Sequence, residues 1–291
     1  MPVLGPNNLR LGATQINKAY LGATLLFDGA GPAFDADALA YITAVETADG
    51  EALEAGVKDA ISDFVVACKA DPSTTPGVSN YEAIKASCIL AGGRSLNGIF
   101  TPFKGPAPTN FNFVTADYNR KTGLKGNGST KYLNSNRDAL SDAQNNLHMS
   151  LYLTDASSAG DRVHISSPTG GSGRRSSIER LLIDDSLRLS SRRSLAANDF
   201  PEAGGTVGFL GHSRSESSQF TGRFSGANNL IEVASLSIVG GNILIFAQPG
   251  ATLSLYSDAR LSFYSIGESL DLAALDTRVT ALMTALEGAI T

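Results

Sequence analysis

The amino-acid sequence predicts a mainly β protein, an antiparallel sandwich or jelly roll that follows a helical segment and a short N-terminal β meander. Three observations support this prediction. Short alternating runs of apolar and polar residues, separated by Gly, Asn, Ser and Asp, fill the chain from residue 106 onwards. Residues 35–70 carry apolar residues at helical spacing. The phrase LGAT occurs twice before residue 30. We therefore expect three parts, 1–30, 31–105 and 106–291.

The N-terminal part contains LRLGATQINKAYLGATLLFDG, from Leu9 to Gly29. Glycine and small residues after each apolar run favour tight turns between short strands at 9–11, 15–21 and 25–27. These strands present more apolar surface than so short a segment buries by itself, from Ile16, Tyr20, Leu21, Leu25 and Phe27. Two interpretations remain: an edge hairpin packed on its own domain, or an attachment module buried against another protein. The second is favoured because the sandwich downstream has its own strands and its own closing helix.

Composition excludes several classes of partner. At 291 residues the chain is long enough for two domains or for one large β domain with additions. A net charge of -5 with 18% charged residues argues against nucleic acid or an anionic membrane as the main partner. Cys68 and Cys88 lie in apolar surroundings, which favours reduced core residues over a disulfide. The beginning, MPVLGPNNLRLGA, lacks the basic and apolar regions of a signal peptide, so we expect synthesis in a cytoplasm and no membrane insertion.

The second part is predicted to be a helical hairpin and spacer. Two runs of apolar residues at helical spacing predict two helices within residues 35–70, with Asp35 and Asp49 as their N-caps. After a break rich in Pro, Gly and Ser, YEAIKASCILAGG (81–93) predicts a third short helix. Helical hairpins of this kind are usually packing elements, and we expect no catalytic residues on them.

The third part is predicted to form a series of short strands. The runs are TGLKGNGSTKYLNS, NLHMSLYLTDAS, ERLLIDDSLRLSS, GTVGFLGHSRS, NLIEVASLSIVGGNILIFA and RLSFYSIG. Within the third of them, Asp184, Asp185 and Ser186 predict the turn of a hairpin. Strands spaced by about ten residues are typical of a sandwich or jelly roll rather than of a parallel α/β sheet.

A helix is expected to close the chain. Apolar residues recur three and four apart in DLAALDTRVTALMTALEGAI, at Leu272, Leu275, Val279, Leu282 and Leu286. Asp271 is its expected N-cap. Fewer than three heptads do not hold an oligomer by themselves, so packing onto the sandwich is favoured over a seam along a three-fold axis.

The order of these motifs resembles known proteins. GLKGNGSTKYLNSN resembles the opening strand pair of laminin-G-like, concanavalin A-like jelly rolls, NLHMSLYLTD the next strand, and ARLSFYSIGESLDLAALDTRVTALMTAL the last strand with a short helix. From Asp35 to the C-terminus the chain resembles virion proteins of tailed bacteriophages, and residues 9–29 are similar to short β modules at the ends of tail and fibre proteins. This resemblance implies a virion surface protein, that is, a tail fibre, head spike or decoration subunit.

The resemblance also implies partners. The N-terminal module would attach to other virion proteins, the jelly roll would bind host cell-surface glycans during adsorption, and a homotrimer is favoured. Two other functions remain open: a capsid or tail decoration protein without receptor binding, and a polysaccharide-degrading enzyme.

Candidate glycan-binding residues follow from chemistry. A glycan site needs an aromatic face beside amide, carboxylate or guanidinium groups, and the chain offers these types at Tyr118, Asn119, Arg120, Tyr132 and Asn134. Tyr132 equally suits the core side of its strand, and the chain contains no Trp.

A second candidate is the arginine-rich run GGSGRRSSIER with the later SSRRS. Its arginines are Arg174, Arg175, Arg180, Arg192 and Arg193. Because guanidinium groups bind acidic groups bidentately, the run indicates a phosphate or acidic-sugar patch, and solvated loop tips are the favoured alternative.

Catalysis, metals and cofactors are not expected. Glycosidases place two carboxylates on either side of the scissile bond, whereas Glu179, Asp184 and Asp185 have unsuitable spacing at a predicted hairpin turn. The three histidines, at 148, 164 and 212, lack metal-ligand spacing. No glycine-rich loop lies in a βαβ setting, so we expect no nucleotide cofactor.

Overall fold

The computed structural model describes residues 34–158, 160–182, 185–194, 199–200 and 205–291, together with the backbone of short strands between residues 10 and 28. The chain divides into two units, Met1–Ala36 and Asp37–Thr291. The expected boundary at residue 105 lies within the second unit.

In the described residues of the first unit, four short strands form two antiparallel pairs in place of the expected three-stranded meander. Strand β1 (Arg10–Leu11) pairs with β2 (Thr14–Gln15), and β3 (Lys18–Leu21) pairs with β4 (Thr24–Asp28). Each copy of LGAT therefore begins on one strand and ends on its partner, with Leu11 opposite Thr14 and Leu21 opposite Thr24. The side chains proposed for attachment, of Ile16, Tyr20, Leu21, Leu25 and Phe27, lie outside the described part of the structure.

The second unit is built from two antiparallel sheets and a layer of helices, which confirms the predicted antiparallel sandwich. One sheet, called here the helix-side sheet, has the order β17 (Ala227–Ile231), β16 (Phe220–Phe224), β15 (Gly208–Arg214), β10 (Leu147–Asp155), β19 (Arg260–Gly267), β8 (Gly123–Lys125) and β7 (Tyr118–Asn119), with β5 (Ile84–Ile89) also paired to β19. The other, the outer sheet, has the order β14 (Asp199–Phe200), β13 (Leu187–Arg193), β12 (Arg175–Arg180), β11 (Arg162–Ser166), β18 (Asn242–Ile245), β9 (Tyr132–Asp138) and β6 (Thr109–Phe111).

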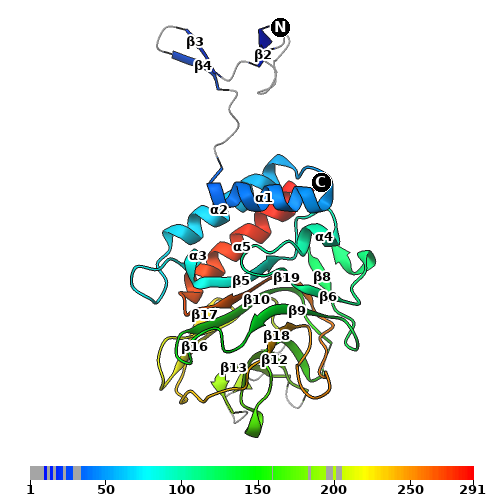
Figure 1. The fold of residues 1–291 in the computed structure, drawn as a ribbon, viewed down its shortest axis with the longest axis vertical. Coiled ribbons are helices and arrows are strands. Elements are labelled where there is room, and N and C mark those ends of the chain that lie inside the picture. The colour runs from blue at the N-terminus through cyan, green and yellow to red at the C-terminus, as the bar shows by residue number, and fades with distance from the viewer. Residues whose placement is uncertain are drawn as a thin grey trace. The chain divides into compact units, whose positions relative to one another are not determined.

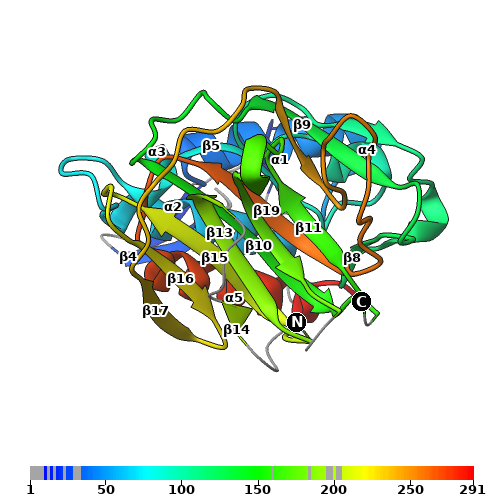
Figure 2. The ribbon, with the colours of Figure 1, turned by 90° about the horizontal axis from the view of Figure 1, so that it is seen from below.

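The α-helices of the described residues lie on the side of the helix-side sheet (Figure 1). They are α1 (Ala36–Asp49), α2 (Ala55–Ala70), α3 (Asn80–Ala83), α4 (Leu96–Ile99) and α5 (Leu272–Ala289). Figure 1 shows α1, α2 and α5 against the sheet that contains β5, β10 and β19, with the outer sheet on the far side of it. Figure 2, turned by 90°, views the unit from the side of the outer sheet, where β11 and β13 lie in front. Among the described residues, no α-helix covers the other face of the outer sheet (Figure 1).

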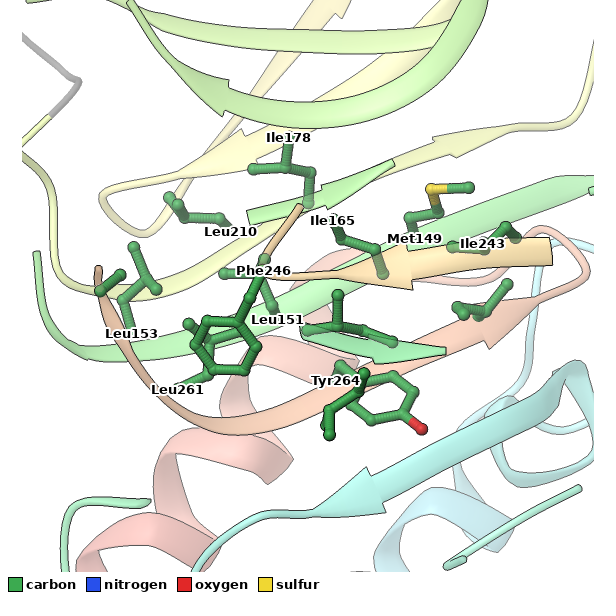
Figure 3. Packing of buried hydrophobic residues seen from close by; sticks show 14 of the residues in the cluster. Met149, Leu151, Leu153, Ile165, Ile178, Leu210, Ile243, Phe246, Leu261 and Tyr264 are labelled. Atoms are coloured by element: carbon green, nitrogen blue, oxygen red, sulfur yellow. The ribbon is translucent and has the colours of Figure 1, made fainter. Parts of the chain in front are cut away.

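The core fills the space between the two sheets. Alternate residues of β10, Met149, Leu151 and Leu153, are buried against Ile165 and Ile178 of the outer sheet (Figure 3). This alternation follows from the two-residue period of a strand, which sends successive side chains to opposite faces. It also determines which residues of the outer sheet point away from the core.

The predicted third helix is wrong. Only α3 is helical, and the residues after it, Ile84 to Ile89, form β5. This strand runs antiparallel to β19, with Ile89 opposite Phe263 and Ser87 opposite Ser265. Pairing with a distant strand satisfies the backbone hydrogen-bonding groups of β5 and overrides its local helical pattern. Part of the expected spacer is thus a strand of the sandwich.

The predicted capping role of Asp49 is also wrong. Asp49 is the last residue of α1, whereas α2 follows Glu54 and receives no side-chain cap. The carboxylate of Asp49 instead accepts hydrogen bonds from the backbone N–H groups of Arg94, 2.7 Å, and Ser95, 2.8 Å. Asp49 therefore ties the end of α1 to the segment before α4.

Helix α5 begins at its predicted cap. The Asp271 carboxylate accepts hydrogen bonds from the backbone N–H groups of Ala273, 2.8 Å, and Ala274, 3.1 Å. The residues of its apolar stripe, Leu272, Leu275, Val279, Leu282 and Leu286, are all buried within the chain. Within the residues that the structure describes, no helix is long and apolar enough to cross a membrane.

Both cysteines are free and buried, as predicted. Burial raises the pKa of the Cys68 thiol and that of the Cys88 thiol to about 12 each. Because the thiolate is the reactive form, both residues behave as apolar core side chains at neutral pH.

Candidate functional site

Two groups of side chains lie on the face of the outer sheet that no helix covers. In β9, Leu133 belongs to the core, and the strand period assigns Tyr132 and Asn134, on either side of it, to the opposite face. Tyr132 is half-buried and also packs against the core. In β12, Ile178 belongs to the core, so Arg175 and Glu179 also point away from it. Figure 2 shows this face of the outer sheet. We call the two groups the aromatic patch and the arginine cavity.

The aromatic patch consists of Phe111, Tyr132 and Tyr256. Phe111 of β6 lies directly opposite Tyr132 of β9, and their rings stack with centroids 4.3 Å apart and planes 5° from parallel. The Tyr256 ring meets Tyr132 edge-on at 6.3 Å. Because β6 is the edge strand, the second face of the Phe111 ring is turned away from β9, and Phe111 is 37% exposed. The patch therefore offers one open aromatic face at the rim of the sheet.

Amide and hydroxyl groups lie beside the patch, one residue pair along the same two strands. Thr109 is opposite Asn134, and the Asn134 Oδ1 atom accepts a hydrogen bond from the Asn136 backbone N–H, 2.9 Å. Asn136 Nδ2 donates to the Thr109 hydroxyl, 2.9 Å. Among the described residues, the Asn134 Nδ2 group has no partner. An unengaged donor thus lies roughly 7 Å along the strand from the stacked rings.

The aromatic patch carries no uncompensated charge. Partial burial, followed by the neighbouring Tyr256, raises the pKa of Tyr132, so its phenol stays neutral. The nearby Lys131 ammonium group forms an ion pair with Asp117. This environment suits a neutral ligand with both apolar and hydroxyl surface.

The arginine cavity has a volume of about 420 Å³. It is lined by Asp161, Arg162, Arg175, Glu179, Arg180, Leu181, Arg188, Gln248 and Leu255. The Arg175 guanidinium donates from Nε and Nη2 to the two carboxylate oxygens of Glu179, at 2.8 and 2.6 Å. Ser177 donates a further hydrogen bond to Glu179. Both members of this pair are almost fully buried, at 3% and 1% exposure, which fixes their geometry.

The other arginines of the cavity also face carboxylates. Arg180 Nε donates to Asp185 at 2.5 Å, and Arg162 lies 3.5 Å from Asp258. Arg188 of β13 is directly opposite Glu179 of β12. The favoured alternative of solvated loop tips therefore does not describe this region.

The remaining arginines of the predicted patch are used by the fold. Arg192 is buried and donates from Nη2 to the carbonyl oxygens of Ala139, 2.8 Å, and Asp142, 2.7 Å. Arg193 is buried and donates to the Leu189 carbonyl oxygen, 3.1 Å. Arg174 lies at the surface end of the run, where its Nε donates to the Gly171 carbonyl oxygen, 2.9 Å. Of the predicted patch, only Arg175 and Arg180 line the cavity.

The structure separates the other predicted glycan residues from Tyr132 and Asn134. Tyr118 and Asn119 form β7 of the helix-side sheet. The Tyr118 hydroxyl donates to the Gly93 carbonyl oxygen, 2.6 Å, and Asn119 accepts hydrogen bonds from the turn that follows it. Arg120 forms an ion pair with Glu54. The polar groups of these three residues therefore hold loops of the fold together.

Sequence reasoning missed three residues of the surface, Phe111, Tyr256 and Gln248. Phe111 lies in the run NFNF, whose alternation was a signal for a half-exposed aromatic strand. Tyr256 and Gln248 carry no comparable signal, because their places depend on how a long loop returns to the sheet.

The three histidines are fully buried, each on a strand of one of the two sheets. His148 is hydrogen-bonded to the Glu268 carbonyl oxygen, 2.6 Å, and His164 to the Ser257 hydroxyl, 2.8 Å. His212 has no partner at either ring nitrogen among the described residues. Within that same part of the chain, no group of three or more His, Cys, Asp or Glu side chains has an arrangement that could hold a metal ion.

The carboxylates considered for catalysis are engaged or not described. Glu179 accepts hydrogen bonds from Arg175 and Ser177, and Asp185 accepts one from Arg180. Asp184 lies outside the described residues. Both described carboxylates are therefore already engaged by hydrogen bonds within the fold.

No protein-family model and no curated protein sequence matches this chain. Its backbone is similar to a Trypanosoma rangeli sialidase in complex with sialic acid, with 10% identity, a TM-score of 0.48, and coverage of 76% of this chain and 37% of the sialidase. It is also similar to the botulinum neurotoxin serotype D binding domain, with 11% identity, a TM-score of 0.42, and coverage of 68% of this chain and 51% of that domain. A third similar structure is domain 4 of a GH43 extracellular arabinanase from Geobacillus stearothermophilus in complex with arabinotriose. It has 11% sequence identity and a TM-score of 0.35, and the match covers 68% of this chain and 99% of that domain. The chain thus spans less than half the length of the sialidase.

Proposed function

We propose that the second unit is a carbohydrate-binding β-sandwich and that the aromatic patch is its sugar-binding surface. The observation that carries this proposal is the stacked pair of Phe111 and Tyr132, with an open ring face at the sheet edge and the free amide donor of Asn134 beside it. A sugar ring has an apolar face of C–H groups and a rim of hydroxyls. The apolar face packs on an aromatic ring, and the hydroxyls form hydrogen bonds with amide groups.

The same proposal places the protein on the surface of a tailed-phage virion, as a fibre or spike subunit that contacts host glycans. Its support is the order of motifs along the sequence and the division of the chain into a small N-terminal unit and a large sandwich. Binding without catalysis is favoured over polysaccharide cleavage because Glu179 and Asp185 are held by arginines. Decoration without receptor binding remains the second candidate.

A glycan array that includes bacterial surface polysaccharides tests the sugar-binding proposal, with titration calorimetry on the strongest polysaccharide. We expect saturable binding by the full chain and at least about a tenfold loss of affinity in Phe111→Ala and Tyr132→Ala. The matched control is Leu230→Ala, an exposed apolar residue of β17 in the other sheet, which should bind as the wild type does. Absence of binding, or equal loss in all three variants, would overturn the proposal.

The virion assignment has its own test. Crosslinking of intact particles followed by mass spectrometry should join residues 1–30 to another virion protein. Deletion of residues 1–33 should leave the sandwich folded but absent from particles. A truncated chain that still assembles contradicts the attachment role.

A further inference from the structure

The aromatic patch and the arginine cavity are connected by one segment, residues 248–256. Gln248 and Leu255 line the cavity, and the next residue, Tyr256, belongs to the patch. The segment is fixed at both ends: Gln248 bridges to Ser254, and the Leu255 carbonyl oxygen accepts a hydrogen bond from the Val163 backbone N–H, 2.8 Å. The same segment therefore contributes to both the cavity and the patch.

The charges of the cavity are balanced. Four arginines, Arg162, Arg175, Arg180 and Arg188, and two carboxylates, of Asp161 and Glu179, line the cavity. Two further carboxylates beside it, of Asp258 and Asp185, form ion pairs with Arg162 and Arg180, and Arg175 pairs with Glu179. With no net charge the cavity has no general attraction for an anion. It presents alternating donors and acceptors, and hydroxyl groups match this pattern because each hydroxyl both donates and accepts.

Two polar atoms of the lining residues have no hydrogen-bond partner among the described residues. Gln248 donates from Nε2 to the Thr169 hydroxyl, 2.9 Å, but its Oε1 atom is buried and accepts nothing. The Arg162 Nε atom, 3.5 Å from Asp258, is likewise buried and makes no hydrogen bond. An orphaned acceptor and an orphaned donor are costly in a folded protein, and both are satisfied by a hydroxyl-bearing ligand.

We propose that the arginine cavity is a second subsite and binds an uncharged, hydroxyl-rich sugar unit of the same oligosaccharide that stacks on the aromatic patch. This inference rests on the proposed function, since it names the ligand class of that surface. Strands β9 and β12 are three strand spacings apart in the outer sheet, about 14 Å. A ligand that reaches both subsites is therefore an oligosaccharide and not a single sugar.

The test compares disaccharide and hexasaccharide fractions prepared by partial hydrolysis of the polysaccharide that binds most strongly on the array. With the full chain we expect the hexasaccharide to bind about tenfold more tightly than the disaccharide. Gln248→Ala, which removes a cavity group, and Gln248→Trp, which fills the cavity, should abolish this gain. The matched control is Gln144→Ala, because exposed Gln144 also donates one hydrogen bond to a serine hydroxyl, 3.0 Å, elsewhere on the surface.

Salt dependence distinguishes the neutral ligand class from an acidic one. Hexasaccharide affinity should change by less than about twofold between roughly 0.05 and 0.5 M NaCl, since screening affects only charged partners. A tenfold loss over that range, or binding only by carboxylate-bearing fractions, would overturn the neutral assignment. Equal affinity of the two fractions, or an unaltered gain in both Gln248 variants, would overturn the subsite while leaving the patch in place. If the proposed function itself is wrong, the wild type binds no glycan on the array, and this result is seen before the fractions are compared.

Discussion

The Arg120 guanidinium donates to both carboxylate oxygens of Glu54, at 2.9 and 2.7 Å, and so joins the end of β7 to the start of α2. The same guanidinium also donates to the carbonyl oxygens of Gly92 and Gly93. A residue whose type suggested a glycan contact therefore fixes the helical layer to the sandwich. This ion pair leads to a prediction about stability.

Glu54→Gln should lower the free energy of unfolding by about 1 kcal/mol, because it replaces a bidentate ion pair that is partly exposed to solvent. The Arg120 side chain, through its hydrogen bonds, lowers the pKa of Glu54 to about 2. The stabilisation is thus present above about pH 4.5 and is lost as the pH falls towards 2. Urea unfolding at pH 7 and pH 3 measures both effects. If the difference in unfolding free energy between the wild type and Glu54→Gln is as large at pH 3 as at pH 7, this account is wrong.

The three buried histidines predict loss of stability in mild acid. Burial lowers the pKa of His148 and of His164 to about 4, and burial, followed by His148, Arg214 and Arg193, lowers that of His212 to about 3. The unfolded chain binds protons near pH 6.5 while the folded chain does not. Stability is therefore complete above pH 6.5 and falls below it, by about 2 kcal/mol per histidine at pH 5.

His212→Leu removes the contribution of one of the three histidines to the pH dependence of stability. Neither ring nitrogen of His212 has a partner among the described residues, so an apolar side chain of similar size loses no hydrogen bond. We expect unchanged or higher stability at pH 7.5 and a decrease between pH 7.5 and 5 that is smaller by about 2 kcal/mol than in the wild type. Chemical denaturation at a series of pH values measures it. An unchanged pH dependence means that His212 is already protonated, or solvated, in the folded protein.

Local patterns in the sequence predict most of the sandwich and not the way its parts meet. Strands β10 and β19 follow from alternating runs, because the two-residue period is a property of the strand itself. Strand β5 was missed, since its conformation depends on pairing with β19, far along the chain. The C-terminal helix was predicted because its cap and its apolar stripe are both local.

In the candidate site, too, residues with a local sequence signal were predicted and residues placed by strand pairing were not. Tyr132 and Asn134 were identified from residue type and strand position, and the structure places both on the uncovered face. Tyr118 lies only fourteen residues before Tyr132 in the sequence. It nevertheless belongs to the other sheet, because the chain passes from one sheet to the other between β8 and β9. The Phe111 stack was not foreseen, since it depends on the register between β6 and β9.

Gly123, the first residue of β8, is predicted to stabilise the fold because it has no side chain. Gly123 has a φ of +93°, and a Cβ atom there would lie 2.1 Å from the Leu261 carbonyl oxygen. Gly123→Ala should therefore cost about 3 kcal/mol of stability through strain and displacement of β19. Gly226→Ala is the matched control, since Gly226 has a φ of +73° but nothing within 4 Å, and should cost only about 1 kcal/mol. Thermal unfolding of both variants separates backbone strain from the close contact, and equal losses would show that the contact relaxes freely.

The apolar stripe of α5 is predicted to stabilise the single chain. Leu286 is fully buried, next to the position where a Cβ atom on Gly92 would come within 3.2 Å of it. Leu286→Ala should lower the free energy of unfolding by about 3 kcal/mol, because it opens a cavity in the helical layer. Leu39→Ala, at a 49% exposed position of α1, should change it by no more than about 0.5 kcal/mol. Urea unfolding gives these values, and sedimentation equilibrium gives the mass of each variant. If the stripe lined a three-fold axis, Leu286→Ala would dissociate an oligomer and leave the stability of the separated chain unchanged.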